Sequence, residues 1–200
     1  MAVTGILGGA FDPPHVGHLR LARAATERFG LDRLLVTVVE HPGHRGTEAA
    51  AAHRLALARL AFEDVPGAVV EAEPEAYTVD ALQRRGLDDP IFLIGADQFA
   101  AFPTWRQPER VLELARLGVA TRPGYPRQTL DAVLATLERP ERVLLFELEP
   151  VDVSATDIRM RVSLGEPIDG LVPPAVAAAI ERLALYRTSD ATSAPIGVRP

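Results

Sequence analysis

Six short apolar runs recur along this chain of 200 residues, and stretches with helical periodicity lie between them. A short continuous apolar run suits a strand that is buried on both faces, as the strands of parallel sheets are. The runs predict strands at residues 3–7, 34–39, 68–72, 91–94, 117–120 and 143–148. Their alternation with helices predicts an α/β fold, in which a Rossmann-like, doubly wound parallel sheet carries helices on both faces.

Several of the predicted helices have readable ends. Thr78 is expected to be an N-cap, and Pro108 suits a first helical position, where its missing N–H loses nothing. Ser154 and Asp157 have the spacing of a capping box, and Gly165 is expected to close the helix that Ser154 begins. In addition to the helix that begins at Ser154, helices are predicted at residues 17–29, 50–62, 79–85, 108–116, 128–138 and 174–185.

The domain organisation is predicted to be simple. No internal repeat or long linker divides residues 1–186, so they are expected to form one doubly wound domain. Residues 187–200 read RTSDATSAPIGVRP, which is polar and has no periodicity. This tail is expected to be disordered.

Composition excludes several classes of function. The formal net charge of −6 and the pI near 5.4 leave no broad basic face for nucleic acid or an anionic membrane. The sequence has no lysine, so any side-chain cation that binds phosphate must be arginine or protonated histidine. It has no cysteine, which excludes disulfides and thiolate zinc sites and suits the cytoplasm. The apolar run at residues 3–7 is broken by Gly5 and followed by the polar stretch Asp-Pro-Pro-His, so we expect it to be neither a signal peptide nor a membrane span. The oligomeric state, a homo-oligomer included, stays open.

The stretch GGAFDPPHVGH at residues 8–18 is the first candidate site. In doubly wound folds, ligands bind at the carboxyl ends of the strands. Gly8 and Gly9 follow the first predicted strand and would let a ligand approach the backbone, while His15 and His18 lie at the start of the next helix. Backbone N–H groups, a helix N-terminus and two imidazoles at one place predict an anion site, most naturally for phosphate.

Other motifs narrow the choice. The dinucleotide fingerprint GxGxxG and the lysine-containing P-loop are both absent from the sequence, which argues against a redox Rossmann protein or a P-loop NTPase. A competing hypothesis is a zinc site, because His41 and His44 repeat the spacing of His15 and His18. Residues 42–43, Pro-Gly, disfavour the helix that would bring His41 and His44 together.

Two stretches carry a resemblance to a known superfamily. GGAFDPPHVGH resembles the GGxFDPxHxGH signature of the nucleotidyltransferases with an HxGH motif, and VSATDIR at residues 153–159 is similar to their second signature, ISSTxIR. Further matches resemble the nicotinate-nucleotide adenylyltransferase family, and they lie at residues 44–45, 53–54, 77–80, 95–97, 103–105, 121–125 and 171–186.

The resemblance implies an enzyme of NAD biosynthesis that joins nicotinate mononucleotide and ATP to give nicotinate adenine dinucleotide and pyrophosphate. It implies that His15 and His18 contact the ATP phosphates, with His18 at the α-phosphate. Arg159 and Thr156 would hold the β and γ phosphates, and magnesium would accompany ATP without a dedicated metal site. The complete ATP-binding set implied is Gly8, Gly9, Phe11, His15, His18, Arg45, Ser154, Thr156 and Arg159, of which His15, His18 and Arg159 are catalytic.

The resemblance also implies an acceptor site made of five residues. Trp105 would stack on the pyridine ring, and backbone donors at Tyr77 and Thr78 would receive its carboxylate. Asp97 would bind ribose hydroxyls, and Arg122 would face the acceptor phosphate.

Three departures from the family pattern keep other functions open. The loop at residues 40–45 reads EHPGHR, Ala155 replaces a serine, and residues 71–76, EAEPEA, are acidic beside the expected nicotinate carboxylate. One alternative is a paralogue that acts on another phosphorylated acceptor, such as nicotinamide mononucleotide. Another is a nucleotide-binding module without turnover.

Overall fold

The computed structural model describes residues 2–43, 46–121 and 125–187. Its centre is one six-stranded sheet in the order β3-β2-β1-β4-β5-β6, in which every neighbouring pair is parallel. The strands are β1 (Thr4–Gly9), β2 (Arg33–Val39), β3 (Ala68–Glu73), β4 (Ile91–Gly95), β5 (Arg116–Thr121) and β6 (Val143–Glu147). The six predicted strands and the doubly wound parallel sheet are confirmed.

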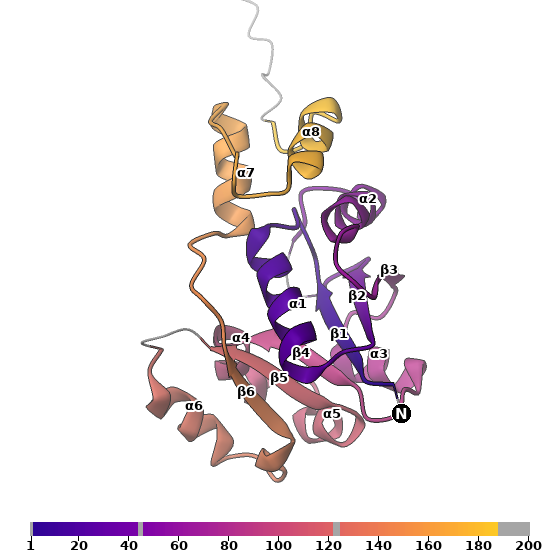
Figure 1. Ribbon diagram of the computed structural model, residues 1–200, viewed down its shortest axis with the longest axis vertical. Helices are drawn as coiled ribbons and strands as arrows, with labels where there is room; N and C mark the ends of the chain where they lie inside the picture. The colour runs from indigo at the N-terminus through magenta and orange to yellow at the C-terminus, as the bar shows by residue number, and fades with distance from the viewer. Residues whose placement is uncertain (1, 44–45, 122–124, 188–200) are drawn as a thin grey trace, which may run out of the picture.

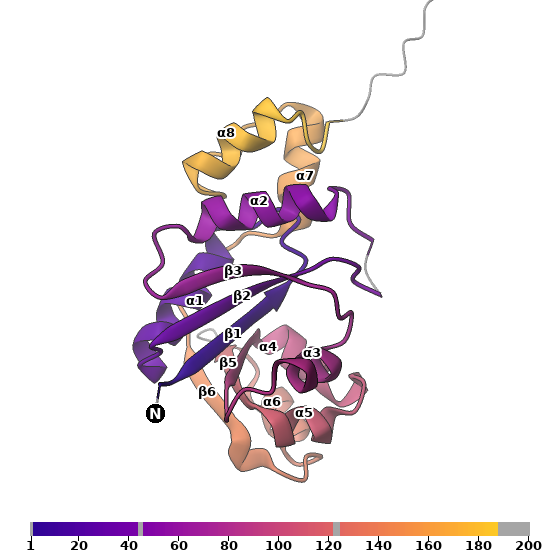
Figure 2. The same cartoon turned by 90° about the vertical axis from the view of Figure 1, so that its right-hand side faces the viewer.

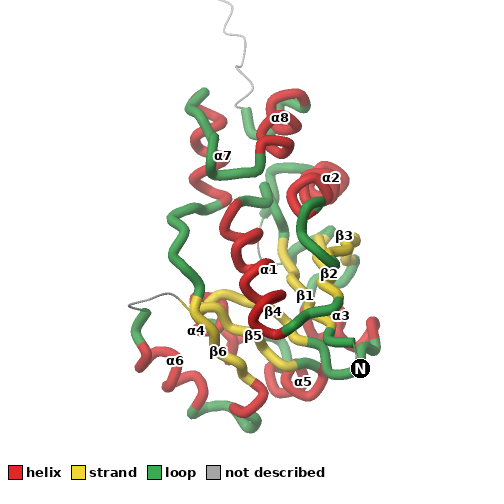
Figure 3. The backbone as a smooth tube through the Cα atoms, viewed as in Figure 1, coloured by secondary structure: helices red, strands yellow, loops and turns green. Residues whose placement is uncertain are grey.

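Helices cover both faces of this sheet, as Figures 1 and 2 show. The α-helices are α1 (Val16–Phe29), α2 (Ala51–Phe62), α3 (Thr78–Arg85), α4 (Ala96–Ala100), α5 (Pro108–Leu114), α6 (Arg127–Leu134), α7 (Ala155–Leu164) and α8 (Pro174–Arg182), and short 3-10 turns lie at Phe102–Thr104 and Pro140–Arg142. Figure 3 shows the loop that carries the chain from β6 to α7.

The strands alternate their side chains between two apolar layers. Leu7 and Val36 pack with the buried side of α1, α2 and α8, whereas Ile6 and Leu35 pack with α3, α4, α5 and α6. This is the consequence of a period of two along a strand whose faces are both covered. Helix α8 also packs on α2, beyond the edge of the sheet.

The helix ends differ from prediction in places. Ser154 Oγ accepts a hydrogen bond from the Asp157 N–H at 3.0 Å, and Gly165 ends α7 with φ at 72°, so both predicted ends are confirmed. Pro108 is the first residue of α5, as predicted. Thr78 is not an N-cap, because Tyr77 has the extended backbone of the cap and Thr78 is the first helical residue.

Three helices end earlier than predicted, and one short helix was not predicted. Helix α8 ends at Arg182 rather than at residue 185. Helix α5 ends at Leu114 rather than residue 116, because Arg116 already pairs with Ile91 in the sheet. Helix α6 ends at Leu134, since the following residues turn back toward β6. Helix α4 was not predicted, because five residues are too few to show a helical period. In the described ranges no helix combines the length and apolar character that a bilayer crossing requires.

Candidate active site

The site lies where the sheet order reverses. Strand β1 pairs with β2 on one side and with β4 on the other, so the chain leaves β1 and β4 toward opposite faces. Such a switch point leaves a crevice at the carboxyl ends of the strands, which is where ligands bind in open α/β sheets. The predicted stretch 8–18 begins there: β1 ends at Gly9, and His15 is the N-cap of α1.

The two histidines form one unit at the start of α1. Their ring centroids lie 3.7 Å apart, and the His15 backbone N–H donates to Nδ1 of His18 at 3.1 Å. Because Nδ1 of His18 accepts this bond, the neutral ring carries its proton on Nε2. The ring of Phe11 lies 4.9 Å from that of His18 and packs edge-on against Phe62. His18 is therefore a positioned hydrogen-bond donor.

Burial keeps both histidines neutral at ordinary pH. It lowers the pKa of His15 from 6.5 to about 4. Burial, and then the proximity of His15, lowers the pKa of His18 well below 6.5. The pair thus offers an N–H dipole rather than a full positive charge, and Nδ1 of His15 has no hydrogen-bond partner among the described residues.

These pKa shifts predict a loss of stability in mild acid. Between pH 6.5 and about 4 the unfolded chain binds protons on histidines that the folded protein leaves neutral, so the free energy of unfolding falls as the pH falls through that window. We expect His15→Gln to make this fall shallower, by at most about 1.4 kcal/mol per pH unit for one proton. Denaturant unfolding at several pH values measures the two slopes. Above pH 7 the slopes should coincide, and equal slopes below pH 6 would contradict the assignment.

A buried carboxylate fixes the loop before the histidines. Asp12 is 6% exposed, and its oxygens accept hydrogen bonds from the backbone N–H groups of Glu48 (2.7 Å) and Ala49 (3.2 Å) and from the Tyr186 hydroxyl (2.8 Å). Burial, and then Asp12, raises the pKa of Tyr186, so this hydroxyl remains a donor. The first N–H of α1, that of Val16, donates to the Leu171 carbonyl at 3.0 Å.

A buried arginine holds the same loop from the other side. Arg54 is 1% exposed, and its guanidinium donates to four backbone carbonyls at 2.7–3.1 Å. The carbonyls belong to the loop after β1, the end of β2 and the turn before α2, namely Ala10, Val39, Glu40 and Ala49. One side chain therefore ties together three segments around the site.

Arg159 reaches the site from α7. Its Nη1 donates to the Asp12 carbonyl at 2.9 Å, and its Nε forms an ion pair with Glu48 at 2.6 Å. Arg159 and Thr156 line a cavity of about 480 Å³ whose other walls include Glu48 and Tyr186. An anionic ligand in this cavity would compete with Glu48 for the guanidinium.

A second cavity of about 580 Å³ opens at the carboxyl ends of β1, β2 and β4. Six predicted site residues line it: Gly8, Gly9, Tyr77, Thr78, Asp97 and Trp105. The Trp105 ring packs edge-on against the rings of Phe102 and Phe92, with ring centroids 5.3 Å and 6.3 Å apart, and these contacts fix its position. A Cβ on Gly8 would lie 3.2 Å from the Phe92 ring and from Thr37 Oγ1, so packing as well as ligand access favours glycine there.

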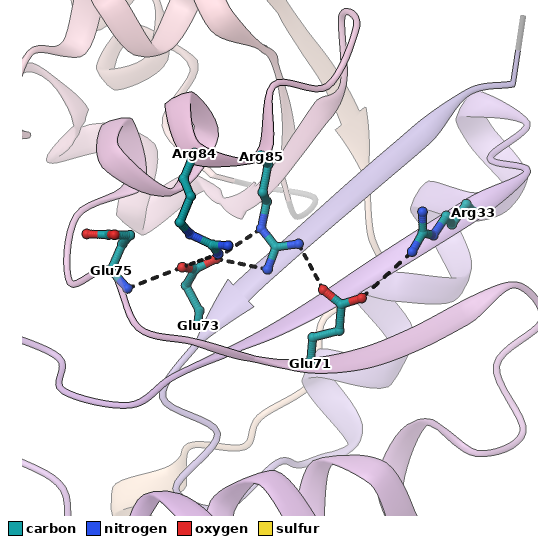
Figure 4. Close-up of polar contacts among 6 residues, drawn as sticks. All are labelled: Arg33, Glu71, Glu73, Glu75, Arg84 and Arg85. Atoms are coloured by element: carbon teal, nitrogen blue, oxygen red, sulfur yellow. Dashed lines mark hydrogen bonds and ion pairs between the residues drawn. The ribbon is translucent and has the colours of Figure 1, made fainter.

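Two of the three glutamates in the acidic segment beside this cavity, Glu71 and Glu73, are paired with arginines (Figure 4). Glu73 is 1% exposed and receives hydrogen bonds from Arg84 (2.7 and 2.9 Å), Arg85 (3.0 Å) and the Glu75 N–H (3.2 Å). Burial alone would raise the pKa of Glu73, but these contacts outweigh it and lower the pKa. Glu71 pairs with Arg85 at 3.0 Å and with Arg33 at 3.7 Å. The network also ties α3 to the edge strand β3.

The remaining predicted residues have different places. Phe11 is 2% exposed and supports the His18 ring from behind, whereas Ser154 caps α7. Arg45 and Arg122 lie outside the described residues. The zinc hypothesis gains no support: within residues 2–43, 46–121 and 125–187 no group of three or more His, Asp or Glu side chains could hold a metal ion, and His44 lies outside those ranges.

Sequence reasoning missed the residues that support the site. Asp12, Arg54 and Tyr186 lie in stretches that resemble the family but have no predicted role, and Glu48 lies in none of those stretches. Asp12 lies inside the histidine motif, which was a usable signal. No sequence signal marks Glu48, because its partner Arg159 is 111 positions away in the sequence.

Comparison with known proteins gives relatives over almost the whole chain. The sequence model of the cytidylyltransferase-like family matches residues 6–161. A protein of Roseiflexus sp. named "probable nicotinate-nucleotide adenylyltransferase" is 39% identical, and the match covers 93% of this chain and 98% of the relative. A protein of Chromobacterium violaceum with the same name is 40% identical, with 93% and 99% covered.

Solved structures support the fold. The nicotinic acid mononucleotide adenylyltransferase of Plasmodium falciparum, complexed with NaAD, superposes with a TM-score of 0.79 at 14% identity, covering 93% of this chain and 98% of the other. A putative nicotinate-nucleotide adenylyltransferase of Vibrio parahaemolyticus gives a TM-score of 0.63 at 20% identity, with 94% and 98% covered.

Proposed function

This chain belongs to the cytidylyltransferase-like family and, within it, to the nicotinate-nucleotide adenylyltransferases, and we propose that it transfers the adenylyl group of ATP to nicotinate mononucleotide in NAD biosynthesis. The observation that carries the proposal is the positioned Nε2–H donor of His18 at the switch point of the sheet. Residues 8–15 link the two cavities, since Gly8 and Gly9 line one and the Asp12 carbonyl accepts a hydrogen bond from Arg159, which lines the other.

The reaction needs positioning and charge stabilisation rather than a covalent intermediate. A phosphate oxygen of the mononucleotide forms a bond to the α-phosphorus of ATP, while the bond from that phosphorus to the bridging oxygen breaks and pyrophosphate leaves with the electron pair. Negative charge grows on the oxygens of the α-phosphate in the transition state. His18 Nε2–H is the donor proposed for those oxygens, and His15 holds the ring that carries it.

Arg159, Thr156 and the N-terminus of α7 are proposed to bind the β and γ phosphates. The triphosphate would displace Glu48 from Arg159, so nucleotide binding exchanges one anionic partner of the guanidinium for another. Mg²⁺ enters as part of the substrate MgATP. Arg45 would add a second cation on the phosphates, as the family resemblance implies.

The cavity beside Trp105 is the proposed acceptor site. Its ring would stack on the pyridine, backbone donors at Tyr77 and Thr78 would meet the ring substituent, and Asp97 would bind the ribose hydroxyls. Arg122 is proposed for the acceptor phosphate.

Pyrophosphate release from MgATP tests the function directly, with nicotinate mononucleotide and nicotinamide mononucleotide compared side by side. We expect the enzyme to form the dinucleotide and to prefer nicotinate mononucleotide clearly over nicotinamide mononucleotide. Turnover confined to another phosphorylated acceptor would show a paralogue. ATP binding without turnover would show a nucleotide-binding module.

Trp105→Ala separates the two substrates. Removing the stacking surface should raise KM for the mononucleotide by about tenfold, while KM for ATP changes little, because base–aromatic stacking contributes about 1–3 kcal/mol. Steady-state kinetics with each substrate varied in turn measures this. Phe102→Leu, a buried neighbour in contact with Trp105, is the packing control. An effect confined to KM for ATP would refute the acceptor assignment.

A further inference from the structure

The acceptor cavity presents more negative than positive charge to its ligand. Three carboxylates line it, from Glu73, Glu75 and Asp97. Arg84 and Arg85 compensate Glu73, but the ion pairs within the described part of the chain include neither Glu75 nor Asp97. A ligand that brings a carboxylate into this cavity meets repulsion unless a cation offsets it.

Arg106 is the one basic side chain that lines this cavity among the residues that the structure describes. It follows Trp105 directly in the sequence. Its guanidinium lies 4.9 Å from the centre of the Tyr77 ring, and its Nη1 forms an ion pair with Asp80 at 3.0 Å. The stacking on Tyr77 and the contact with Asp80 hold the group at the rim of the cavity, and its side chain remains 50% exposed.

From this placement we propose that Arg106 selects the acceptor by the charge of its ring substituent, favouring the carboxylate of nicotinate over the amide of nicotinamide. The inference rests on the proposed function. Nicotinate and nicotinamide mononucleotide differ at this one group, so a cation near the ring discriminates where stacking on Trp105 cannot. Asp80 engages one end of the guanidinium, and the other N–H groups remain for a carboxylate.

The position of the α3 N-terminus supports this role. Tyr77, under the guanidinium, is the N-cap of α3, and Thr78 is its first residue. Arg106 therefore lies beside the backbone donors that are proposed to meet the ring substituent. A carboxylate there would contact both neutral N–H dipoles and a cation, whereas an amide would gain little from the cation.

The experiment compares kcat/KM for the two mononucleotides in the wild type, Arg106→Gln and Arg106→Lys. We expect Arg106→Gln to lower kcat/KM for nicotinate mononucleotide about tenfold and to leave kcat/KM for nicotinamide mononucleotide within about twofold. For Arg106→Lys, kcat/KM for nicotinate mononucleotide should lie between the values for the wild type and Arg106→Gln, because lysine keeps the charge but loses the planar fork. The matched control is Arg110→Gln, because Arg110 is 44% exposed, pairs with Glu113 at 2.6 Å and lines neither cavity. In this variant the ratio of kcat/KM for nicotinate mononucleotide to kcat/KM for nicotinamide mononucleotide should equal that of the wild type.

Each other result is informative. An equal loss of kcat/KM for both mononucleotides in Arg106→Gln would show that the residue only maintains the shape of the cavity, which overturns the proposal. Wild-type kcat/KM for both mononucleotides would overturn it too. Calorimetric binding of each mononucleotide gives a second readout that needs no turnover. If the wild type neither binds nor turns over either mononucleotide, the proposed function itself fails and this inference falls with it.

Discussion

His18→Ala is expected to lower kcat about 100-fold or more while the melting temperature changes little. The side chain donates to oxygens whose negative charge grows in the transition state, and loss of one such donor commonly lowers kcat by roughly two to three powers of ten. KM for ATP should change much less, because the ground-state triphosphate retains Arg159, Thr156 and the helix N-terminus.

Two further substitutions at position 18 separate the roles of the two ring nitrogens. Asparagine places an acceptor near the site of Nδ1, so His18→Asn can keep the bond from the His15 N–H but lacks a donor at Nε2. Glutamine reaches the Nε2 position with an N–H. We expect His18→Gln to retain more kcat than His18→Asn, and single-turnover kinetics would isolate the chemical step. Near wild-type turnover in His18→Ala or His18→Asn would rule out the catalytic role.

The second large effect concerns stability. Arg54→Met is expected to lower the free energy of unfolding by about 3 kcal/mol or more, because four backbone carbonyls lose their charged donor in a buried place. For a chain of this size, that corresponds to a melting temperature lower by about 10 °C. Methionine fills much of the volume, so the loss reports on the hydrogen bonds rather than on a cavity.

The control for Arg54→Met is Arg59→Met, the same change at an exposed position of the same helix. It should shift the melting temperature by less than about 2 °C. Arg54→Lys should also be destabilising, since one ammonium cannot span carbonyls from three segments. Calorimetry and denaturant unfolding measure all three variants. A melting temperature of Arg54→Met equal to that of Arg59→Met would contradict this account.

The fold was predictable because its four central strands, β1, β2, β4 and β5, are largely buried on both faces. Such strands must be nearly continuous in apolar residues, and no other element of similar length has that requirement. The site location followed from a general rule about parallel sheets, which placed Gly8, Gly9 and the histidines at the correct edge. The roles proposed for Trp105 and Arg159 came instead from family resemblance.

The support of the site was not predictable, because each of its contacts joins residues far apart in the sequence. Glu48 meets Arg159 across 111 positions, and Tyr186 meets Asp12 across 174. The acidic residues at 71–76 argue against a site for the nicotinate carboxylate when the sequence is taken alone. In the fold, however, Arg84 and Arg85 compensate the charge of Glu73. Charge along a sequence does not show which charges are paired in the fold.

The bonds from Tyr186 to Asp12 and from Val16 to Leu171 also order events during synthesis. A ribosome makes all six strands and both histidines before it reaches residue 171, so a nascent chain can assemble its sheet early. The histidine loop gains its last two tethers only when residues 171–186 have left the exit tunnel. A chain cut short before residue 171 would lack both tethers and also the residues that Val172 and α8 contribute to the core.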